Sequence, residues 1–254
     1  MLIGLPLSML LLIFAAGAWA GAQNALAGGG SFVTLPVLIL SGLDPRAANI
    51  TSTVALFPAQ VAIGFAGRKG AERTPTLGLR ELVVISLVGG VLGAVLLLAT
   101  PPSFFARLVP WLVLFATGVF AWGNFLRKPP AATDRPLGRI PSVLIQFGIS
   151  IYGGYFGGGI GFLMLAGLTL MGMGVRPAAA TKNVLAAVMN ASAVAIFLFS
   201  PDLNLVRALA LGAGAIAGGL FGSWALTRVN DRALKLGVVL LGVALTVGLF
   251  WRGV

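Results

Sequence analysis

Long uncharged apolar runs dominate this 254-residue chain and limit its fold more than any other feature. Hydrophobic residues make up 58% of the sequence and charged residues only 9%, whereas soluble domains carry about 25% charged residues. Most runs are close to the length that crosses about 30 Å of hydrocarbon as a helix. They do not alternate in polarity, as barrel strands do. Because helices satisfy their own backbone hydrogen bonds in lipid, the sequence predicts an all-α polytopic membrane protein.

Ten apolar segments are expected to form helices, and eight of them are long enough, or nearly so, to cross a bilayer. The segments cover residues 6–27, 30–42, 47–66, 78–99, 106–126, 141–157, 160–173, 178–199, 204–226 and 233–251. Segments 30–42 and 160–173 would reach only about 20 Å as helices, too short to cross alone. Each follows a triple glycine, Gly28–Gly30 in the first case and Gly157–Gly159 in the second.

The two halves of the chain share these features in the same order. The triple glycine recurs, and the Gly-Gly-x-x-Gly pattern at 89–93 recurs at 218–222. Such a long repeat is typical of a duplicated transporter half. We therefore expect an N-terminal transmembrane repeat at residues 1–126, a polar cytoplasmic linker at 127–140 and a C-terminal transmembrane repeat at 141–254.

Basic side chains gather in three short stretches, at 67–80, 127–139 and 228–235, and the positive-inside rule places all three in the cytoplasm. The counterparts of two of these stretches in the other repeat, 200–207 and 100–107, carry one basic residue each. Equivalent loops are then expected on opposite sides of the membrane. This predicts two five-segment repeats in inverted topology, each with a short helix after its glycine break. The alternative is eight spans with two re-entrant hairpins.

The glycine breaks are the first candidate binding site. Three glycines before a segment too short to span predict a helix break inside the bilayer, and such a break survives only where it is buried or lines a cavity. The short helix that follows directs its N-terminal N–H groups and partial positive charge toward the break. Inverted repeats bring two such N-termini together near the midplane, which predicts an anion site. The alternative is that the glycines only permit close helix packing.

Polar side chains near the breaks complete the candidate site. Lys182 either reaches the bound anion or extends to the membrane interface, and the sequence leaves both open. Ser31 adds a hydroxyl at the start of the first short helix, whereas Ile160 at the matching place adds none. The candidate substrate-binding residues are Gln23, Asn24, Gly28, Gly29, Gly30, Ser31, Thr51, Ser52, Tyr152, Tyr155, Gly157, Gly158, Gly159, Thr181, Lys182, Asn183 and Asn190.

The residue types that usually carry enzyme chemistry are absent or lie at the wrong depth. The sequence has no histidine and no cysteine. Its six acidic residues all fall in expected loops or helix ends: Asp44, Glu72, Glu81, Asp134, Asp202 and Asp231. We therefore expect no metal, no cofactor and no enzymatic activity. The net charge of +11 is explained by the loops and does not indicate a nucleic-acid partner.

Two motifs resemble the signatures of the TauE/SafE sulfite-exporter family. The first is Gly-Gly-Gly-Ser-Phe-Val-Thr-Leu-Pro at 28–36, followed by Pro45-x-x-Ala48 and Thr51-Ser52; the second is Gly157–Gly159 followed by Pro177-x-x-Ala180-Thr181. The resemblance covers nearly the whole chain, although the glycine that usually precedes Thr-Ser is Ile50 here. It implies a multi-pass protein of the bacterial inner membrane that exports sulfite, sulfonates or related anions.

The residues and the resemblance together predict a secondary transporter, and more specifically an exporter, of a small sulfur-containing anion such as sulfite or an organosulfonate. It would work by alternating access between the two repeats. Its expected partners are that anion and membrane lipid. Two alternatives stay open: a passive anion channel with the same fold, and a non-transporting membrane assembly subunit.

The inverted topology can be tested by labelling introduced cysteines in intact cells. Cysteines at Arg73, Arg135 and Arg232 should be shielded from an impermeant thiol reagent added outside, because all three lie in stretches expected in the cytoplasm. Cysteines at Ser103 and Asn204 should be labelled. Labelling of the Arg232 site from outside would contradict the inverted repeats and favour the eight-span alternative.

Overall fold

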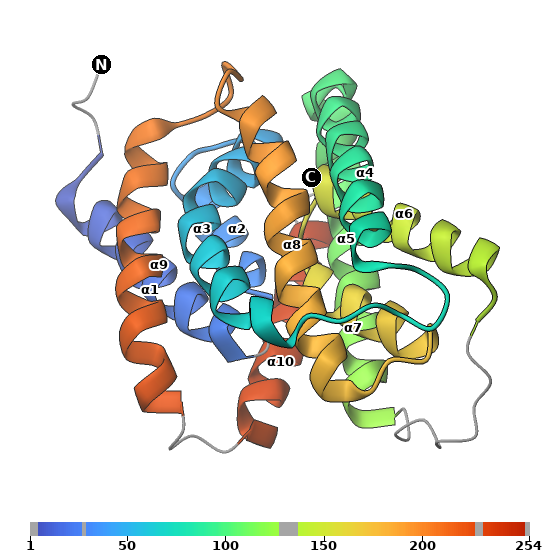
Figure 1. Ribbon diagram of the computed structural model, residues 1–254. Helices are drawn as coiled ribbons and strands as arrows, with labels where there is room; N and C mark the ends of the chain where they lie inside the picture. The colour runs from blue at the N-terminus through green and yellow to red at the C-terminus, as the bar shows by residue number, and fades with distance from the viewer. Residues whose placement is uncertain (1–4, 27–28, 127–136, 227–230, 252–254) are drawn as a thin grey trace.

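The computed structural model describes residues 5–26, 29–126, 137–226 and 231–251, and these ranges contain ten α-helices and no strand (Figure 1). The first half holds α1 (Leu7–Leu26), α2 (Ser31–Leu40), α3 (Pro45–Gly67), α4 (Leu79–Ala99) and α5 (Pro102–Ala121). The second half holds α6 (Arg139–Tyr155), α7 (Ile160–Leu170), α8 (Val175–Phe197), α9 (Leu205–Leu226) and α10 (Asp231–Trp251). A short 3-10 turn (Arg68–Gly70) follows α3, and a π-helical turn (Trp122–Leu126) follows α5. The all-α prediction is confirmed. Gly28, Arg135 and most of the expected linker lie outside the described residues.

Five of the helices are long and apolar enough to cross a membrane by length and composition: α1, α3, α4, α5 and α8. Helices α9 and α10 have 22 and 21 residues, and α6 has 17. The outer faces carry large exposed apolar side chains, among them Phe65, Trp111 and Leu209, which are 63%, 59% and 65% exposed. A soluble protein rarely exposes so much apolar surface, but lipid covers it in a membrane.

The two short helices have matching ends. Two residues after the last residue of α2 stands Gly42 with a φ of +96°, and two residues after the last residue of α7 stands Gly172 with a φ of +92°. In both cases the next N–H bonds back to the carbonyl five residues earlier, at 3.2 and 3.1 Å. This left-handed glycine cap satisfies the last carbonyls of the helix and turns the chain sharply into the long helix that follows. The sequence therefore builds the same helix–turn–helix unit in each half.

Helices of one half pack against helices of the other half. If α1 to α5 are taken in order as the counterparts of α6 to α10, each of the larger contacts between the halves recurs between the two counterpart helices. Helix α1 lies along α9, as α6 lies along α4; α3 contacts α9, as α8 contacts α4. Helix α3 crosses its own counterpart α8, and α5 contacts its counterpart α10. The pattern of helix contacts between the halves is thus largely unchanged when the two halves are swapped.

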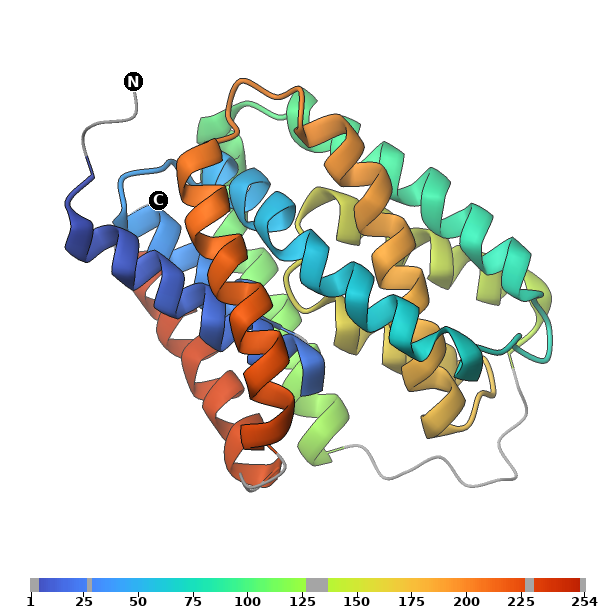
Figure 2. The same cartoon turned by 60° about the vertical axis from the view of Figure 1, so that its left-hand side comes forward.

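The views in Figures 1 and 2 show the directions of these helices. Helix α3 runs downward in Figure 1 and its counterpart α8 runs upward beside it. In Figure 1 the 68–78 loop lies in the lower half of the molecule and the 198–204 loop lies at the upper end, and Figure 2 also separates them. The end of α9 and the start of α10 also lie in the lower half of Figure 1.

Close backbone approach between α1 and α9 requires glycine. A Cβ atom added at Gly218 of α9 would overlap the backbone of Ala18 in α1, and one at Gly214 would overlap the backbone of Phe14. At the neighbouring Gly219 an added Cβ would meet nothing within 4 Å. Part of the Gly-Gly-x-x-Gly pattern in the second half is therefore a packing surface.

These adjacent glycines give a matched pair of stability variants. Gly218→Ala should lower the free energy of unfolding by about 1–3 kcal/mol, because α1 and α9 must move apart. Gly219→Ala should leave it unchanged or raise it by up to about 1 kcal/mol through better helix propensity. Thermal unfolding in detergent measures both. Equal melting temperatures for the two variants would contradict the close contact at Gly218.

Candidate functional site

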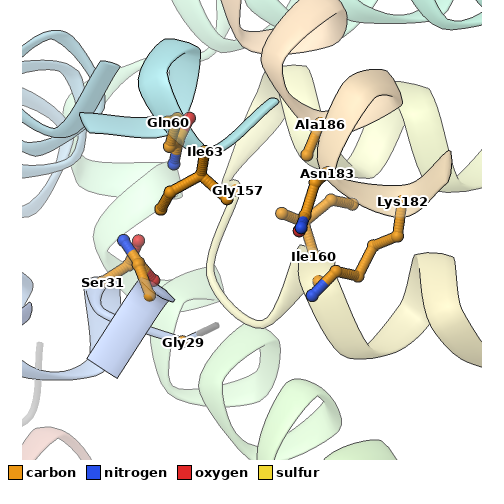
Figure 3. A pocket seen from close by; sticks show the side chains of 11 residues that line it. Gly29, Ser31, Gln60, Ile63, Gly157, Ile160, Lys182, Asn183 and Ala186 are labelled. Carbon is orange, nitrogen blue, oxygen red and sulfur yellow. The ribbon is translucent and has the colours of Figure 1, made fainter. Parts of the chain in front are cut away.

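A cavity of about 50 Å³ lies where the two glycine breaks meet α3 and α8 (Figure 3). Both halves of the chain contribute to its wall. The lining residues are Asn24, Gly29, Ser31, Gln60, Ile63, Gly157, Ile160, Gly161, Lys182, Asn183 and Ala186. Six of them belong to the set expected from the sequence: Asn24, Gly29, Ser31, Gly157, Lys182 and Asn183. The cavity has room for a few water molecules or one small oxyanion.

The first break is held by side chains from the end of α1. Gly29 has a φ of +82°, in the left-handed region that favours glycine. The N–H of Gly30 donates to Asn24 Oδ1 at 2.8 Å, which anchors the start of α2 to α1. Gln23 does not line the cavity. It is buried behind the break, accepts a hydrogen bond from Trp19 Nε1 at 3.1 Å, and would lie next to any side chain placed at Gly29.

The second break is held by aromatic side chains. Gly157 and Gly159 have φ values of +73° and +72°. The Tyr152 hydroxyl donates to the carbonyl oxygen of Gly158 at 2.9 Å, and the Phe156 ring occupies the place that a side chain at Gly158 would take. Of these residues only Gly157 lines the cavity. Tyr152, Gly158 and Gly159 therefore shape the break and do not contribute to the cavity wall.

Near the start of each short helix, one N–H group has no partner among the described residues. In α2, Phe32 N–H bonds to the Gly29 carbonyl; in α7, Phe162 N–H bonds to the Gly159 carbonyl. The N–H groups of Ser31 and Gly161 make no hydrogen bond within the described part of the chain, and both residues line the cavity. The first turns of two short helices from different halves therefore lie at the wall of one cavity, and helix N-termini are favourable places for anions.

Helix α8 adds a positive charge and an amide to the wall. Figure 3 shows the Lys182 side chain running from α8 toward the glycine breaks, with Asn183 above it. The two ion pairs among the described residues are Arg46 with Asp202 and Arg139 with Glu81, so Lys182 has no carboxylate partner there. Since no acidic residue lines the cavity, its wall is electropositive.

Several residues expected in the site serve instead as links between helices. The Ser52 hydroxyl pairs with that of Thr34 at 2.6 Å, and Thr51 Oγ1 accepts the N–H of Asn204 at 3.2 Å. Each uses its hydroxyl in a buried contact with a neighbouring part of the chain. Thr51 and Ser52 belong to the predicted set but do not line this cavity.

Thr181 and Tyr155 likewise lie outside the cavity wall. Thr181 exchanges two hydrogen bonds with the Glu72 backbone, at 2.9 and 3.2 Å, and so ties the 68–78 loop to α8. The Tyr155 hydroxyl donates to Thr100 Oγ1 at 3.4 Å, and its ring packs edge-on against Phe105. Asn190 also stays behind the wall, where it contacts Gln60.

The lining residues outside the predicted set are Gln60, Ile63, Ile160, Gly161 and Ala186. Gln60 could have been found from the sequence, because it is an amide within the apolar stretch of α3, and the same reasoning selected Asn190. The other four are apolar or glycine. They enter the wall because of where α3, α7 and α8 cross, which no local pattern reveals.

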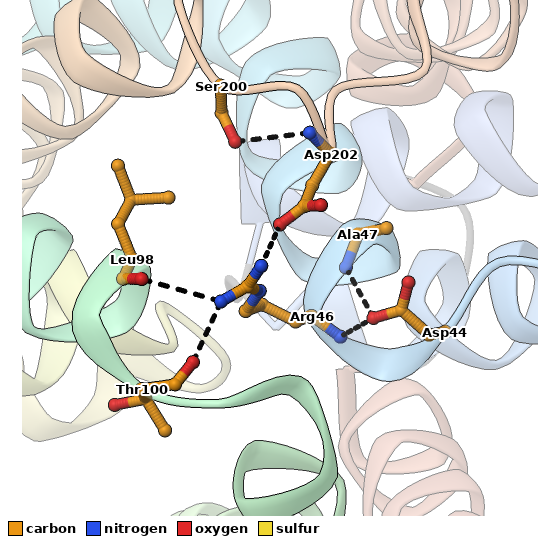
Figure 4. A network of polar contacts seen from close by, with 7 residues as sticks. All are labelled: Asp44, Arg46, Ala47, Leu98, Thr100, Ser200 and Asp202. Carbon is orange, nitrogen blue, oxygen red and sulfur yellow. Dashed lines mark hydrogen bonds and ion pairs between the residues drawn. The ribbon is translucent and has the colours of Figure 1, made fainter.

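A polar network joins the halves at the end of the molecule opposite the 68–78 loop (Figure 4). Arg46 Nη2 lies 2.6 Å from Asp202 Oδ2, and Arg46 Nη1 donates to the carbonyl oxygen of Thr100 at 2.8 Å. Asp44 caps the start of α3 by accepting the N–H groups of Arg46 and Ala47. The guanidinium therefore connects α3 with the α4–α5 and α8–α9 loops.

Residues 13–249 match the family described as sulfite exporter TauE/SafE. The chain belongs to this family. The resemblance seen in its glycine motifs is thereby confirmed. No solved structure was found to match the chain.

Curated relatives agree with this assignment. The chain is 28% identical over 249 residues to a probable membrane transporter protein of Haemophilus influenzae, covering 94% of each protein. A probable membrane transporter protein of a Sinorhizobium species is 28% identical over 254 residues, covering 96% of this chain and 94% of the relative. One from Escherichia coli K12 is 25% identical over 254 residues, covering 97% and 91%. These findings support a multi-pass membrane transporter.

The glycine breaks can be tested by substitution. Gly29→Val should reduce anion binding at least tenfold, because valine is strained at a φ of +82° and the first turn of α2 must shift. Gly118→Val is the matched control, since an added Cβ there meets nothing within 4 Å. Both variants should insert and purify. Equal binding by the two would contradict a role for the break in the site.

Proposed function

We propose that this protein is a secondary transporter that carries a small sulfur-containing anion, such as sulfite or an organosulfonate, across the cell inner membrane. The observation that carries the proposal is that one cavity is lined by residues whose donors have no partner among the described residues. Lys182, the Ser31 N–H and the Gly161 N–H come from three helices and both halves, and no carboxylate lines the same cavity.

The positive charge around this cavity is complementary to the negative charge of an oxyanion. The N-termini of α2 and α7 each contribute about half a positive charge, and Lys182 adds a full one. Backbone N–H groups at helix starts are common ligands of phosphate and sulfate groups. One flexible lysine with helix dipoles holds an anion less rigidly than a bidentate arginine does, which suits reversible release.

The cavity volume supports a small substrate. About 50 Å³ suffices for an inorganic anion such as sulfite in this conformation. An organosulfonate with a longer carbon chain requires the cavity to widen toward one end. The family assignment supports sulfur oxyanions as the substrate class and export as the direction.

Transport is proposed to proceed by alternating access between two inverted repeats. Three observations support this arrangement: the matching helix contacts of the two halves, the opposite directions of α3 and α8, and the position of the end of α9 and the start of α10 in the same lower half of Figure 1 as the 68–78 loop. The basic 67–80 stretch places that end in the cytoplasm. The Arg46 network then closes the outer end and must separate when the cavity opens outward.

Flux measurements on the purified protein in liposomes test the proposal. Sulfite flux should saturate with concentration and should be accelerated by sulfite on the opposite side. Flux that never saturates and shows no such acceleration would identify a passive channel. If sulfite, sulfate, thiosulfate and taurine all fail to move or bind, the protein is not an anion carrier.

Lys182 should dominate the affinity of the site. Lys182→Met is expected to weaken sulfite binding roughly ten- to a hundredfold, the range for losing a charge-assisted hydrogen bond. Lys182→Arg keeps the charge but changes its shape and hydration, so it should be partly tolerated.

Arg176→Met is the matched control for Lys182. Arg176 is an exposed cation on the same helix and does not line the cavity. Equilibrium binding to the four proteins in detergent decides the question. Normal affinity in Lys182→Met would remove the lysine from the site.

A further inference from the structure

The amide of Gln60 enters the cavity from α3, and a second amide behind it fixes its orientation. Asn190 Nδ2 on α8 donates to Gln60 Oε1 at 2.6 Å. Asn190 is 3% exposed, whereas Gln60 is half-buried and lines the cavity. A buried amide that faces another amide is restricted to orientations in which a donor meets an acceptor.

This contact leaves the amide nitrogen of Gln60 facing the cavity. Figure 3 shows that nitrogen on the side of Gln60 toward Ser31, with the oxygen turned away from Ser31. Gln60 Nε2 makes no hydrogen bond with any other residue of the described part of the chain. The two N–H bonds of an amide nitrogen can only donate. Gln60 therefore adds a neutral donor to the cavity wall that holds Lys182.

We propose that Gln60 is a specificity-determining residue that donates to an oxygen of the bound anion, and that Asn190 is the positioning residue that keeps this donor turned toward the cavity. The inference rests on the proposed function and refines its substrate class. The favoured ligand is a fully deprotonated oxyanion, which offers only acceptors. A protonated or amidated analogue that places its own donor against the Gln60 amide nitrogen or the Lys182 ammonium would meet a second donor there, and a site built for hydrogen bonds rejects such mismatches strongly.

The pair also makes the site depend on both halves. Gln60 belongs to the first half and Asn190 to the second, and they meet where α3 crosses α8. If α3 slides against α8, the carbonyl of Gln60 loses its partner and its amide can rotate. The donor then faces the cavity only while the two halves keep this arrangement.

A double-mutant cycle on sulfite binding tests the inference. The four proteins are the wild type, Gln60→Met, Asn190→Leu and the double variant. Methionine is close to glutamine in length, leucine has the branching of asparagine, and neither forms the amide contact. Gln60→Met should bind sulfite about tenfold more weakly, the effect of one charge-assisted hydrogen bond. Asn190→Leu should weaken binding severalfold, and the double variant should bind no more weakly than Gln60→Met alone.

Two further variants distinguish a loss of sulfite binding from a loss of folding stability. Ser86→Ala removes a buried hydrogen bond from Gln146 to Ser86 between α6 and α4, away from the cavity. It should lower the melting temperature without changing sulfite affinity. Gln60→Glu retains an acceptor for Asn190 but presents no donor to the cavity, so it should fold and lose sulfite binding by more than about a hundredfold.

The outcomes separate this inference from the proposed function. If the wild type binds sulfite and Gln60→Met binds it equally well, the role of Gln60 is overturned and the transporter proposal stands. If Asn190→Leu weakens binding as much in the Gln60→Met background as in the wild type, Asn190 acts only through helix packing and its positioning role is overturned. If the wild type binds no sulfur oxyanion at all, both proposals fall.

Discussion

The constraint on which this structure depends is that backbone polar groups must find partners inside a membrane. Long helices satisfy it by themselves, and α4 is an uninterrupted example. The chain departs from it at the two glycine breaks, where left-handed glycines end one helix and start another. As a consequence, the N–H groups of Ser31 and Gly161 have no partner within the described part of the chain. Both residues line a cavity, one of the settings in which irregular backbone is tolerated inside a membrane.

The same two glycine breaks also determine which groups line the candidate site. Both breaks direct a helix N-terminus toward a shared space, and Lys182 reaches that space from α8. The surroundings hold these parts in place: Asn24 binds the first break, Tyr152 binds the second, and Thr181 fixes the loop next to α8. Arg46 joins the halves at the far end. Of these structural links, Asn24 also lines the cavity, whereas Tyr152, Thr181 and Arg46 lie outside its wall.

The sequence predicted the helices well, because apolar length and glycine position are local signals. The expected segment 30–42 became α2 at Ser31–Leu40, and 160–173 became α7 at Ile160–Leu170. The sequence predicted only part of the cavity lining. Glycines and a lysine near a break can be recognised in the sequence, but which hydroxyl groups face the cavity depends on the rotation of each helix about its axis. Thr51, Ser52 and Thr181 turn toward neighbouring helices, while Gln60 turns toward the cavity.

The central claim is that an oxyanion binds between the two glycine breaks, and locating a bound anion tests it most directly. Selenite, the heavier analogue of sulfite, can be located by anomalous diffraction from crystals of the complex. The account predicts one strong selenium peak in the cavity, with its oxygens at hydrogen-bond distance, about 2.7–3.2 Å, from the Ser31 and Gly161 nitrogens and Lys182 Nζ. A selenium peak at another position in the protein, with this cavity empty, would contradict it.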